Sequence, residues 1–275
     1  MKKRQRVFLC IAVITAFAIG FCIWQNNDLT VSNYEYITEK IGGIFNNYKI
    51  AQISDLHNKE FGKNQKRLLK KVRKEKPQII VITGDLVDSR HTNVQAALAF
   101  VREAVKIAPV YYITGNHEHR LAEDTLDNLI SGIEQCGVIV LGNRVEEVFY
   151  NGKESVYLIG LSGDNLHGNT LEKLAENLDD DKLHILLAHE PQYITRYHQP
   201  NMDFVFSGHA HGGQFRLPFI GGLAAPGQGL FPQYTAGLYA YGDVTMVVSR
   251  GLGNSVIPIR IFNRPEIVCV TLRTK

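Results

Sequence analysis

Five short apolar segments, each followed directly by polar residues, limit what this chain can fold into. They are rich in β-branched, aromatic or leucine side chains, as strands are, and comprise residues 48–54, 78–83, 110–114, 184–188 and 203–207. Apolar residues at helical spacing separate the first three segments, over residues 63–76 and 94–106. This β-α-β-α-β order predicts an α/β fold built on a sheet core.

Weaker signals continue along the rest of the chain. An Asn-Gly pair at residues 151–152 lies between two strand-like segments, which is typical of a β-hairpin. Helix-like residues 171–178 precede the fourth strand, and short strands with glycine and proline dominate after residue 214. The formal charge of +3 is too small to favour nucleic acid, and no nucleic-acid partner is expected.

Asp, Asn and His follow the five predicted strands, and these residue types bind divalent cations. Because ligands in open α/β sheets bind beyond the carboxyl ends of the strands, we expect these side chains to meet at one rim. One histidine after a strand is more often a hydrogen-bonded loop residue. So many carboxylates and imidazoles together, however, would be costly to bury unless cations bind them. The residues are Asp55, His57, Asp85, Asp88, Asn116, His117, His189, His209 and His211.

Glycines surround this predicted rim. Gly84, Gly115 and Gly208 stand directly before polar residues, and residues 207–214 read Ser-Gly-His-Ala-His-Gly-Gly-Gln. We expect the glycines to let the backbone turn sharply beside the metals. His209 and His211 could then reach one metal centre.

The motifs D-x-H, G-D, G-N-H-E, H and G-H-x-H, in this order, resemble the five motifs of the calcineurin-like metallophosphoesterases. The resemblance spans residues 48–272 and implies two packed mixed β-sheets flanked by helices. Residues 207–215, 227–239 and 249–267 are further similar to a bacterial membrane-associated phosphodiesterase branch. Relatives of that branch include enzymes that act on lipid headgroups and on UDP-diacylglucosamine.

The resemblance also implies two divalent metal ions, with Mn, Fe or Zn as the expected identities. Asp85 would bridge the two ions. The first site would be completed by Asp55, His57 and His211, and the second by Asn116, His189 and His209. Such a pair of cations catalyses in-line displacement at phosphorus, which predicts a phosphoester hydrolase.

His117 directly follows a predicted ligand without being used by a metal, so we predict that it is the general acid for the leaving oxygen. Asp88 is predicted to hold the tautomer of His117. In the related motif G-D-x-V-D-R-G an arginine follows the second Asp, whereas Ser89 does so here, and the role of Arg90 stays open. Residues 221–229 are expected to be either a loop over the site or a connector.

The N-terminus carries a separate signal. Residues 1–6 are basic, and the uncharged run Val7–Trp24 would span roughly 27 Å as a helix, close to the hydrocarbon thickness of a bilayer. We expect a cytoplasmic basic tip at 1–6, a transmembrane anchor at 7–24, a linker at 25–47 and the metallophosphoesterase domain at 48–275. The alternative is a cleaved signal peptide, but its candidate cleavage motifs lie inside the apolar run.

The positive-inside rule then places the catalytic domain outside the cytoplasmic membrane of a bacterial cell. The favoured hypothesis is a single-pass phosphodiesterase that hydrolyses lipid-linked or headgroup phosphoesters at the outer face of that membrane. The alternatives are an extracytoplasmic nucleotidase or protein phosphatase, and a metal-bound interaction module without catalytic activity.

Overall fold

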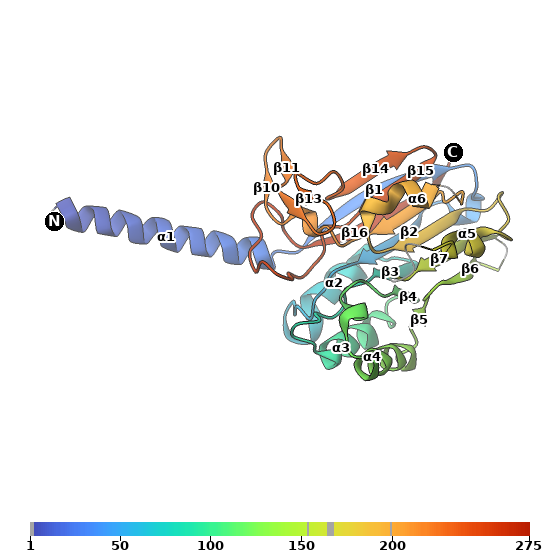
Figure 1. Cartoon of the computed structure of the whole chain (residues 1–275), viewed down its shortest axis with the longest axis horizontal. Coiled ribbons are helices and arrows are strands. Elements are labelled where there is room, and N and C mark those ends of the chain that lie inside the picture. The colour runs from blue at the N-terminus through green and yellow to red at the C-terminus, as the bar shows by residue number, and fades with distance from the viewer. Residues whose placement is uncertain (1–2, 153, 164–167, 199) are drawn as a thin grey trace.

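Two six-stranded β-sheets face one another in the computed structural model, which describes residues 3–152, 154–163, 168–198 and 200–275 (Figure 1). One sheet has the strand order β1-β16-β2-β3-β4-β5 and the other β14-β15-β9-β8-β7-β6. Both are mixed, because β16–β2, β6–β7 and β14–β15 pair antiparallel whereas the other pairs are parallel. The predicted fold of two packed mixed sheets is confirmed.

The strands that carry the predicted site residues are the central ones. The first sheet comprises β1 (Thr30–Thr38), β16 (Glu266–Thr274), β2 (Tyr48–Ile53), β3 (Ile79–Thr83), β4 (Val110–Ile113) and β5 (Ile139–Val140). The second comprises β14 (Gly237–Tyr241), β15 (Val244–Val248), β9 (Phe204–Ser207), β8 (His184–Ala188), β7 (Glu154–Leu161) and β6 (Arg144–Tyr150). The Asn-Gly pair predicted as a hairpin turn lies between β6 and β7.

Helices cover the outer face of each sheet. On the first sheet lie α2 (Lys66–Glu75), α3 (Val94–Ala104) and α4 (Glu123–Gln135), and on the second α5 (Thr170–Ala175) and α6 (Ile194–His198). The sequence explains α2, which buries Leu68, Leu69 and Val72 and leaves most of its basic side chains in solvent. A separate apolar core fills the space between the sheets, so the molecule has four layers.

The segment expected to be a linker is part of the domain instead. Within residues 25–47, β1 pairs in parallel with β16 over nine residues, from Thr30–Glu266 to Thr38–Thr274. Leu29, just before this strand in the sequence, and Phe45, after it, are both buried. The linker prediction failed because β1 has a weak apolar pattern, and its pairing partner lies more than 200 residues away.

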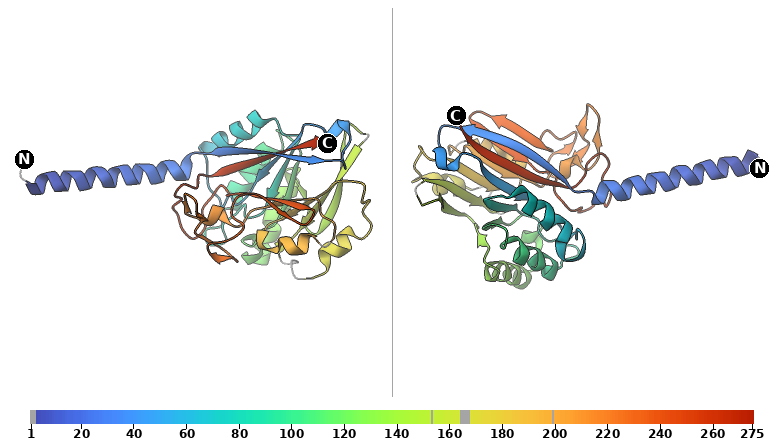
Figure 2. Two further views of the ribbon diagram at one scale, coloured as in Figure 1. Left: turned by 90° about the horizontal axis from the view of Figure 1, so that it is seen from above. Right: turned by 180° about the vertical axis from the view of Figure 1, so that it is seen from behind.

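Helix α1 (Lys3–Asn27) leaves one end of the domain and carries the apolar run (Figure 2). It is long and apolar enough to cross a membrane. Only its last turns reach the domain, where Gln25 is buried and accepts a hydrogen bond from the Asn263 amide. Beside this exit lie two small hairpins, β10 (Arg216–Leu217) with β11 (Gly221–Gly222) and β12 (Ala224–Ala225) with β13 (Gly229–Leu230). Residues 221–229 therefore belong to these hairpins.

Candidate metal centre

The predicted ligands converge between the two sheets, at the carboxyl ends of β2, β3, β4, β8 and β9. Three groups form among the described residues, each with its donor atoms within 4.8 Å of one another. The first contains Asp55, His57 and His211, the second Asp85, His189 and His209, and the third shares His57 and adds Asp88 and His117. The first two are the sets that the motifs predicted, apart from Asn116, whose Oδ1 lies 3.2 Å from His189 Nε2.

Asp85 lies between the two groups. Its Oδ2 is 3.6 Å from His57 Nε2 in one group and 3.3 Å from His189 Nε2 in the other. Its Oδ1 accepts a hydrogen bond from the His117 amide, which fixes the carboxylate in this orientation. Asp85 is therefore the carboxylate that faces both groups.

Burial keeps three of the four predicted histidine ligands neutral, and each of the three rings faces another histidine ring. His57 Nε2 lies 3.2 Å from His211 Nε2, and His209 Nδ1 lies 3.2 Å from His189 Nε2. Burial lowers the pKa of His57 to about 4 and of His209 to about 3, and it holds the pKa of His211 well below its usual range. Facing lone pairs of this kind need a shared proton or a cation between them.

His189 is held differently. Its Nδ1 lies 2.7 Å from the Thr83 carbonyl, so Nδ1 carries the proton and donates, while Nε2 faces Asp85. Burial opposes protonation of this ring, but the Asp85 and Asp55 carboxylates raise the pKa of His189 to about 10. Burial also raises the pKa of Asp55 to about 6. Carboxylates and imidazoles are the donor set of Mn, Fe and Zn, so these residues fit two divalent cations.

The backbone is strained where it presents these side chains. Five of the seven predicted ligands have φ values between 46° and 65°, a left-handed conformation that residues other than glycine seldom adopt. They are Asp55, His57, Asp85, His209 and His211. Such strain costs about 1–3 kcal/mol per residue and clusters at functional sites. The glycines expected to make the sharp turns account for part of them, at Gly84, Gly212 and Gly213, and the predicted ligands themselves make the rest.

The glycines that precede the predicted ligands differ in why the site needs them. Gly84 does have a left-handed φ of 90°. Gly208, in contrast, is needed for space, because a Cβ there would overlap Ser54 Oγ and lie 2.5 Å from Asp55 Oδ2. The β9 turn can approach β2 closely only without a side chain at this position.

His117 faces the site but belongs to neither of the two predicted ligand groups; it lies in the third group, with His57 and Asp88. The Ser89 amide donates to its Nδ1 at 3.0 Å, so the ring proton resides on Nε2, which lies 3.2 Å from Ser255 Oγ. Asp88 was expected to make the Nδ1 contact, but its Oδ1 is 3.9 Å away and accepts from the Arg90 amide at 2.7 Å. The tautomer of His117 is therefore set by a backbone amide.

Glu118 is a residue that sequence reasoning missed. It is fully buried, and its carboxylate accepts hydrogen bonds from the amides of Asp85 (2.9 Å), Val87 (3.1 Å) and Gly115 (2.7 Å). It thus ties the loop after β3 to the loop after β4. Its position in the G-N-H-E motif marked it as a candidate site residue. The motif does not indicate, however, that its carboxylate accepts hydrogen bonds from backbone amides.

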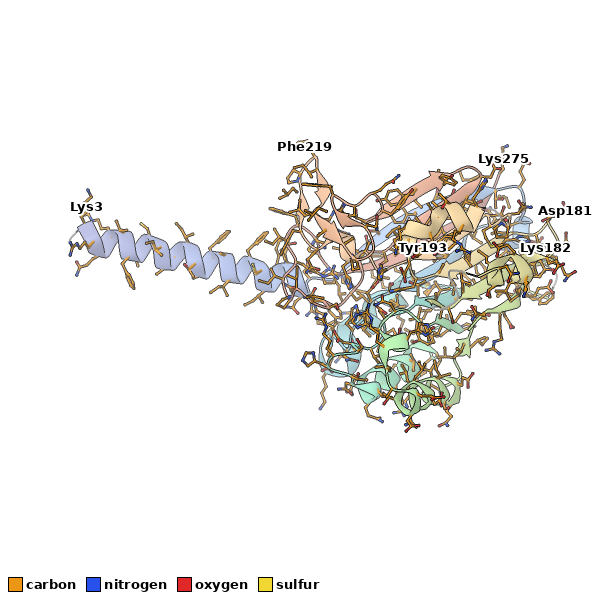
Figure 3. The ribbon with its side chains drawn as sticks, in the orientation of Figure 1. Lys3, Asp181, Lys182, Tyr193, Phe219 and Lys275 are labelled. Atoms are coloured by element: carbon orange, nitrogen blue, oxygen red, sulfur yellow. The ribbon has the colours of Figure 1, made fainter. Side chains whose placement is uncertain are left out.

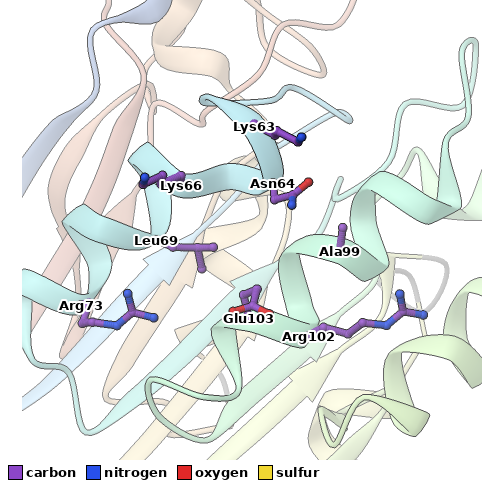
Figure 4. A pocket seen from close by; sticks show the side chains of 8 residues that line it. All are labelled: Lys63, Asn64, Lys66, Leu69, Arg73, Ala99, Arg102 and Glu103. Atoms are coloured by element: carbon purple, nitrogen blue, oxygen red, sulfur yellow. The ribbon is translucent and has the colours of Figure 1, made fainter.

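A cavity of about 340 Å³ opens over this centre. Arg90 and Arg120 line it together with Asp85, Asn116, His117, His209 and His211. Another part of its wall is apolar and comes from Ala224, Ala225, Pro226, Val256 and Ile257. A separate groove lies between α2 and α3, where Lys63, Lys66, Arg73 and Arg102 surround Leu69 (Figure 4). It contains none of the predicted site residues.

Comparison with known proteins agrees with this centre. Residues 48–213 match the family model described as calcineurin-like phosphoesterase. The chain is 30% identical over 235 residues to the uncharacterized metallophosphoesterase YkuE of Bacillus subtilis (strain 168), over 84% of this chain and 80% of that protein. It is 28% identical to a transmembrane protein with metallophosphoesterase domain from Danio rerio, over 98% of this chain and 63% of that protein.

The chain belongs to the calcineurin-like phosphoesterase family. Members of this family use two divalent metal ions, and the two groups around Asp85 could hold them. Family membership and the donor set together indicate a metal-dependent phosphoester hydrolase.

Proposed function

We propose that this protein is a membrane-anchored phosphodiesterase that hydrolyses lipid-linked or headgroup phosphoesters at the outer face of the cytoplasmic membrane. The observation that carries the proposal is the two-sided cavity. Arg90 and Arg120 offer positive charge to a phosphate beside the metal centre, while Val256, Ile257 and Pro226 offer an apolar wall. An amphiphilic phosphoester matches both sides, whereas a nucleotide or a phosphopeptide has less apolar surface to bury there.

The seven ligands would hold two cations, which when bound neutralise phosphoryl oxygens and activate water for in-line attack. His117 would donate its Nε2 proton to the leaving oxygen, because the Ser89 amide keeps Nδ1 as an acceptor. Asp88 would act on His117 indirectly. Its carboxylate accepts a hydrogen bond from the Arg90 amide, which positions the neighbouring Ser89 amide that binds His117. Arg90 would orient the phosphate.

Two observations support the membrane location. Helix α1 has the length and apolar character of a membrane span, and the related Danio rerio protein is described as transmembrane. Lys2, Lys3, Arg4 and Arg6 precede the span, which favours a cytoplasmic N-terminus and a domain on the other side.

The test is an assay of the full chain in phospholipid vesicles and on soluble substrates, with Mn, Fe or Zn added separately. We expect release of headgroup phosphoester from the vesicles, faster hydrolysis of a nitrophenyl phosphodiester than of the monoester, and neither activity in Asp85→Asn. Faster hydrolysis of nucleotides or phosphopeptides than of any lipid diester would contradict the proposed substrate class.

A further inference from the structure

Large apolar side chains are exposed at the end of the domain from which α1 leaves. Outside α1, thirteen large apolar residues of the described chain are exposed. Eleven of them lie between residues 217 and 262, and nine of these eleven lie outside β14. We call these nine the collar: Leu217, Phe219, Ile220, Leu230, Phe231, Val256, Ile257, Ile259 and Phe262. They come from the two small hairpins and from the segment before β16, which both lie beside the exit of α1 (Figures 1 and 2).

Neither packing nor backbone preference within the domain accounts for the collar. Phe219 is fully exposed, Phe231 is 67% exposed and Phe262 is 56% exposed. All three have left-handed backbone conformations, with φ values of 67°, 53° and 51°. A bulky aromatic residue at positive φ is an outlier, and here each of the three side chains is more than half exposed. Figure 3 shows Phe219 at the outer tip of its hairpin.

The segment before β16 is fastened to the end of α1. The Phe262 ring lies 5.5 Å from the Phe21 ring, and the Arg264 guanidinium lies over Trp24 at 5.3 Å and pairs with Asp28 at 2.6 Å. Asn254, at the other end of the segment, donates to Asn26 at 2.8 Å. With α1 in a bilayer, these contacts hold the collar at the membrane surface and not at the end of a flexible tether.

The same segment forms part of the active-site cavity. Ser255 contacts His117 Nε2, and Val256 and Ile257 line the cavity wall while also being 65% and 40% exposed. The side chain of Asn263 donates to the carbonyl of His211 at 2.7 Å. One wall of the cavity mouth is therefore also part of the collar.

Basic residues flank the exit of α1 on its other side. Arg67, which is exposed, donates to the Asn27 carbonyl at 2.7 Å. Lys63, in the turn before α2, and Lys66, the first residue of α2, line the groove of Figure 4. Positive charge beside exposed apolar and aromatic residues is the composition of surfaces that lie in the interfacial layer of a bilayer.

We infer that the collar lies in the interfacial layer of the membrane, so that the cavity opens at the bilayer surface. This inference rests on the proposed anchoring of α1 and deepens the proposed function. A lipid-linked substrate could place its phosphate at the metal centre while its acyl chains stay in the bilayer.

Tryptophan fluorescence in the full chain tests the inference without measuring catalysis. Trp24 is the single tryptophan of the sequence. Trp24→Phe keeps an aromatic ring against Arg264 and gives a background without tryptophan fluorescence. In this background Phe219→Trp and Phe231→Trp each place a probe in the collar. The matched control is Phe149→Trp on β6, which is 60% exposed and lies on the side of the domain away from α1.

The variants are reconstituted in phosphatidylcholine vesicles with or without bromine on the acyl chains. We expect blue-shifted emission and roughly two-fold or stronger quenching by brominated lipid for both collar probes, since interfacial apolar faces are buried about 5–10 Å deep. Phe149→Trp should show neither effect. Collar probes that behave like Phe149→Trp would overturn the inference.

Two further outcomes are informative. Blue-shifted collar probes that brominated lipid does not quench would mean that a protein surface covers the collar, and the inference would fail. Quenched collar probes in an enzyme that is inactive on lipids would uphold the inference and reject the proposed substrate.

Discussion

At the scale of single residues, Asp85 is the side chain that we propose holds the whole centre together. Its two oxygens have separate roles, because Oδ1 is fixed by the His117 amide while Oδ2 faces one histidine from each ligand group. An amide at this position could keep the first contact but offers a poor bridge between two cations.

We therefore expect Asp85→Asn to lose metal from both sites, with turnover falling in proportion. Metal content measured by mass spectrometry and phosphodiester hydrolysis should decrease together. Asp243→Asn, an exposed carboxylate on the turn between β14 and β15, is the control and should retain both. A variant of Asp85 with two metals and normal turnover would refute the bridging role.

The second prediction at this scale concerns His117. His117→Ala should keep both metals, because the amide that binds Asp85 remains, and lose roughly 10²–10⁴-fold in kcat on esters with poor leaving groups. Nitrophenyl esters need less proton transfer and should lose less. Equal losses on alkyl and nitrophenyl diesters would show that His117 does not protonate the leaving group.

At the scale of elements, the site depends on strand ends that approach too closely for ordinary side chains. The turn after β9 packs against Ser54 and Asp55 at the end of β2, and only glycine at position 208 leaves enough space. The hydrogen bonds from the His209 amide to the Asp55 carboxylate, at 3.1 and 3.2 Å, depend on the same approach.

Gly208→Ala should therefore separate the two turns, lower the free energy of unfolding by about 1–3 kcal/mol and weaken metal binding at the site of Asp55. Denaturant unfolding and metal titration measure the two effects. Gly43→Ala is the matched control, since a Cβ at residue 43 meets nothing within 4 Å. If both variants bind metal equally well, close approach at Gly208 does not matter.

At the scale of the whole molecule, β1 connects the apolar helix α1 to the sheet. Its pairing with β16 covers nine residues, and β16 is largely buried between β1 and β2. Removing β1 would leave β16 as a long apolar edge strand, which favours aggregation.

We expect residues 28–275 to fold and unfold cooperatively as a soluble piece. A piece that begins at residue 48 should be poorly soluble or melt at a clearly lower temperature. Thermal unfolding followed by circular dichroism compares the two pieces. Identical melting temperatures would mean that β1 adds nothing to the stability of the domain.

The sequence alone determined the alternating strands and helices, the apolar N-terminal helix and the set of polar residues at the strand ends. These features are local, because apolar periodicity and residue type can be read within a few positions. The order of the five motifs then indicated the family, which the comparisons confirmed. The seven predicted ligands came from motif order. The structure brings six of them together in two groups and places Asn116 against His189.

Only the tertiary structure decided how those residues are held. Hydrogen bonds between segments distant along the chain connect Ser89 to His117 and connect Glu118 to the loop after β3. Gly208 likewise leaves space for a distant segment, the end of β2. The pairing of β1 with β16 and the fastening of α1 beside the collar are of the same kind. Such contacts depend on distances between side chains and backbone that folding alone creates, and no local pattern encodes them.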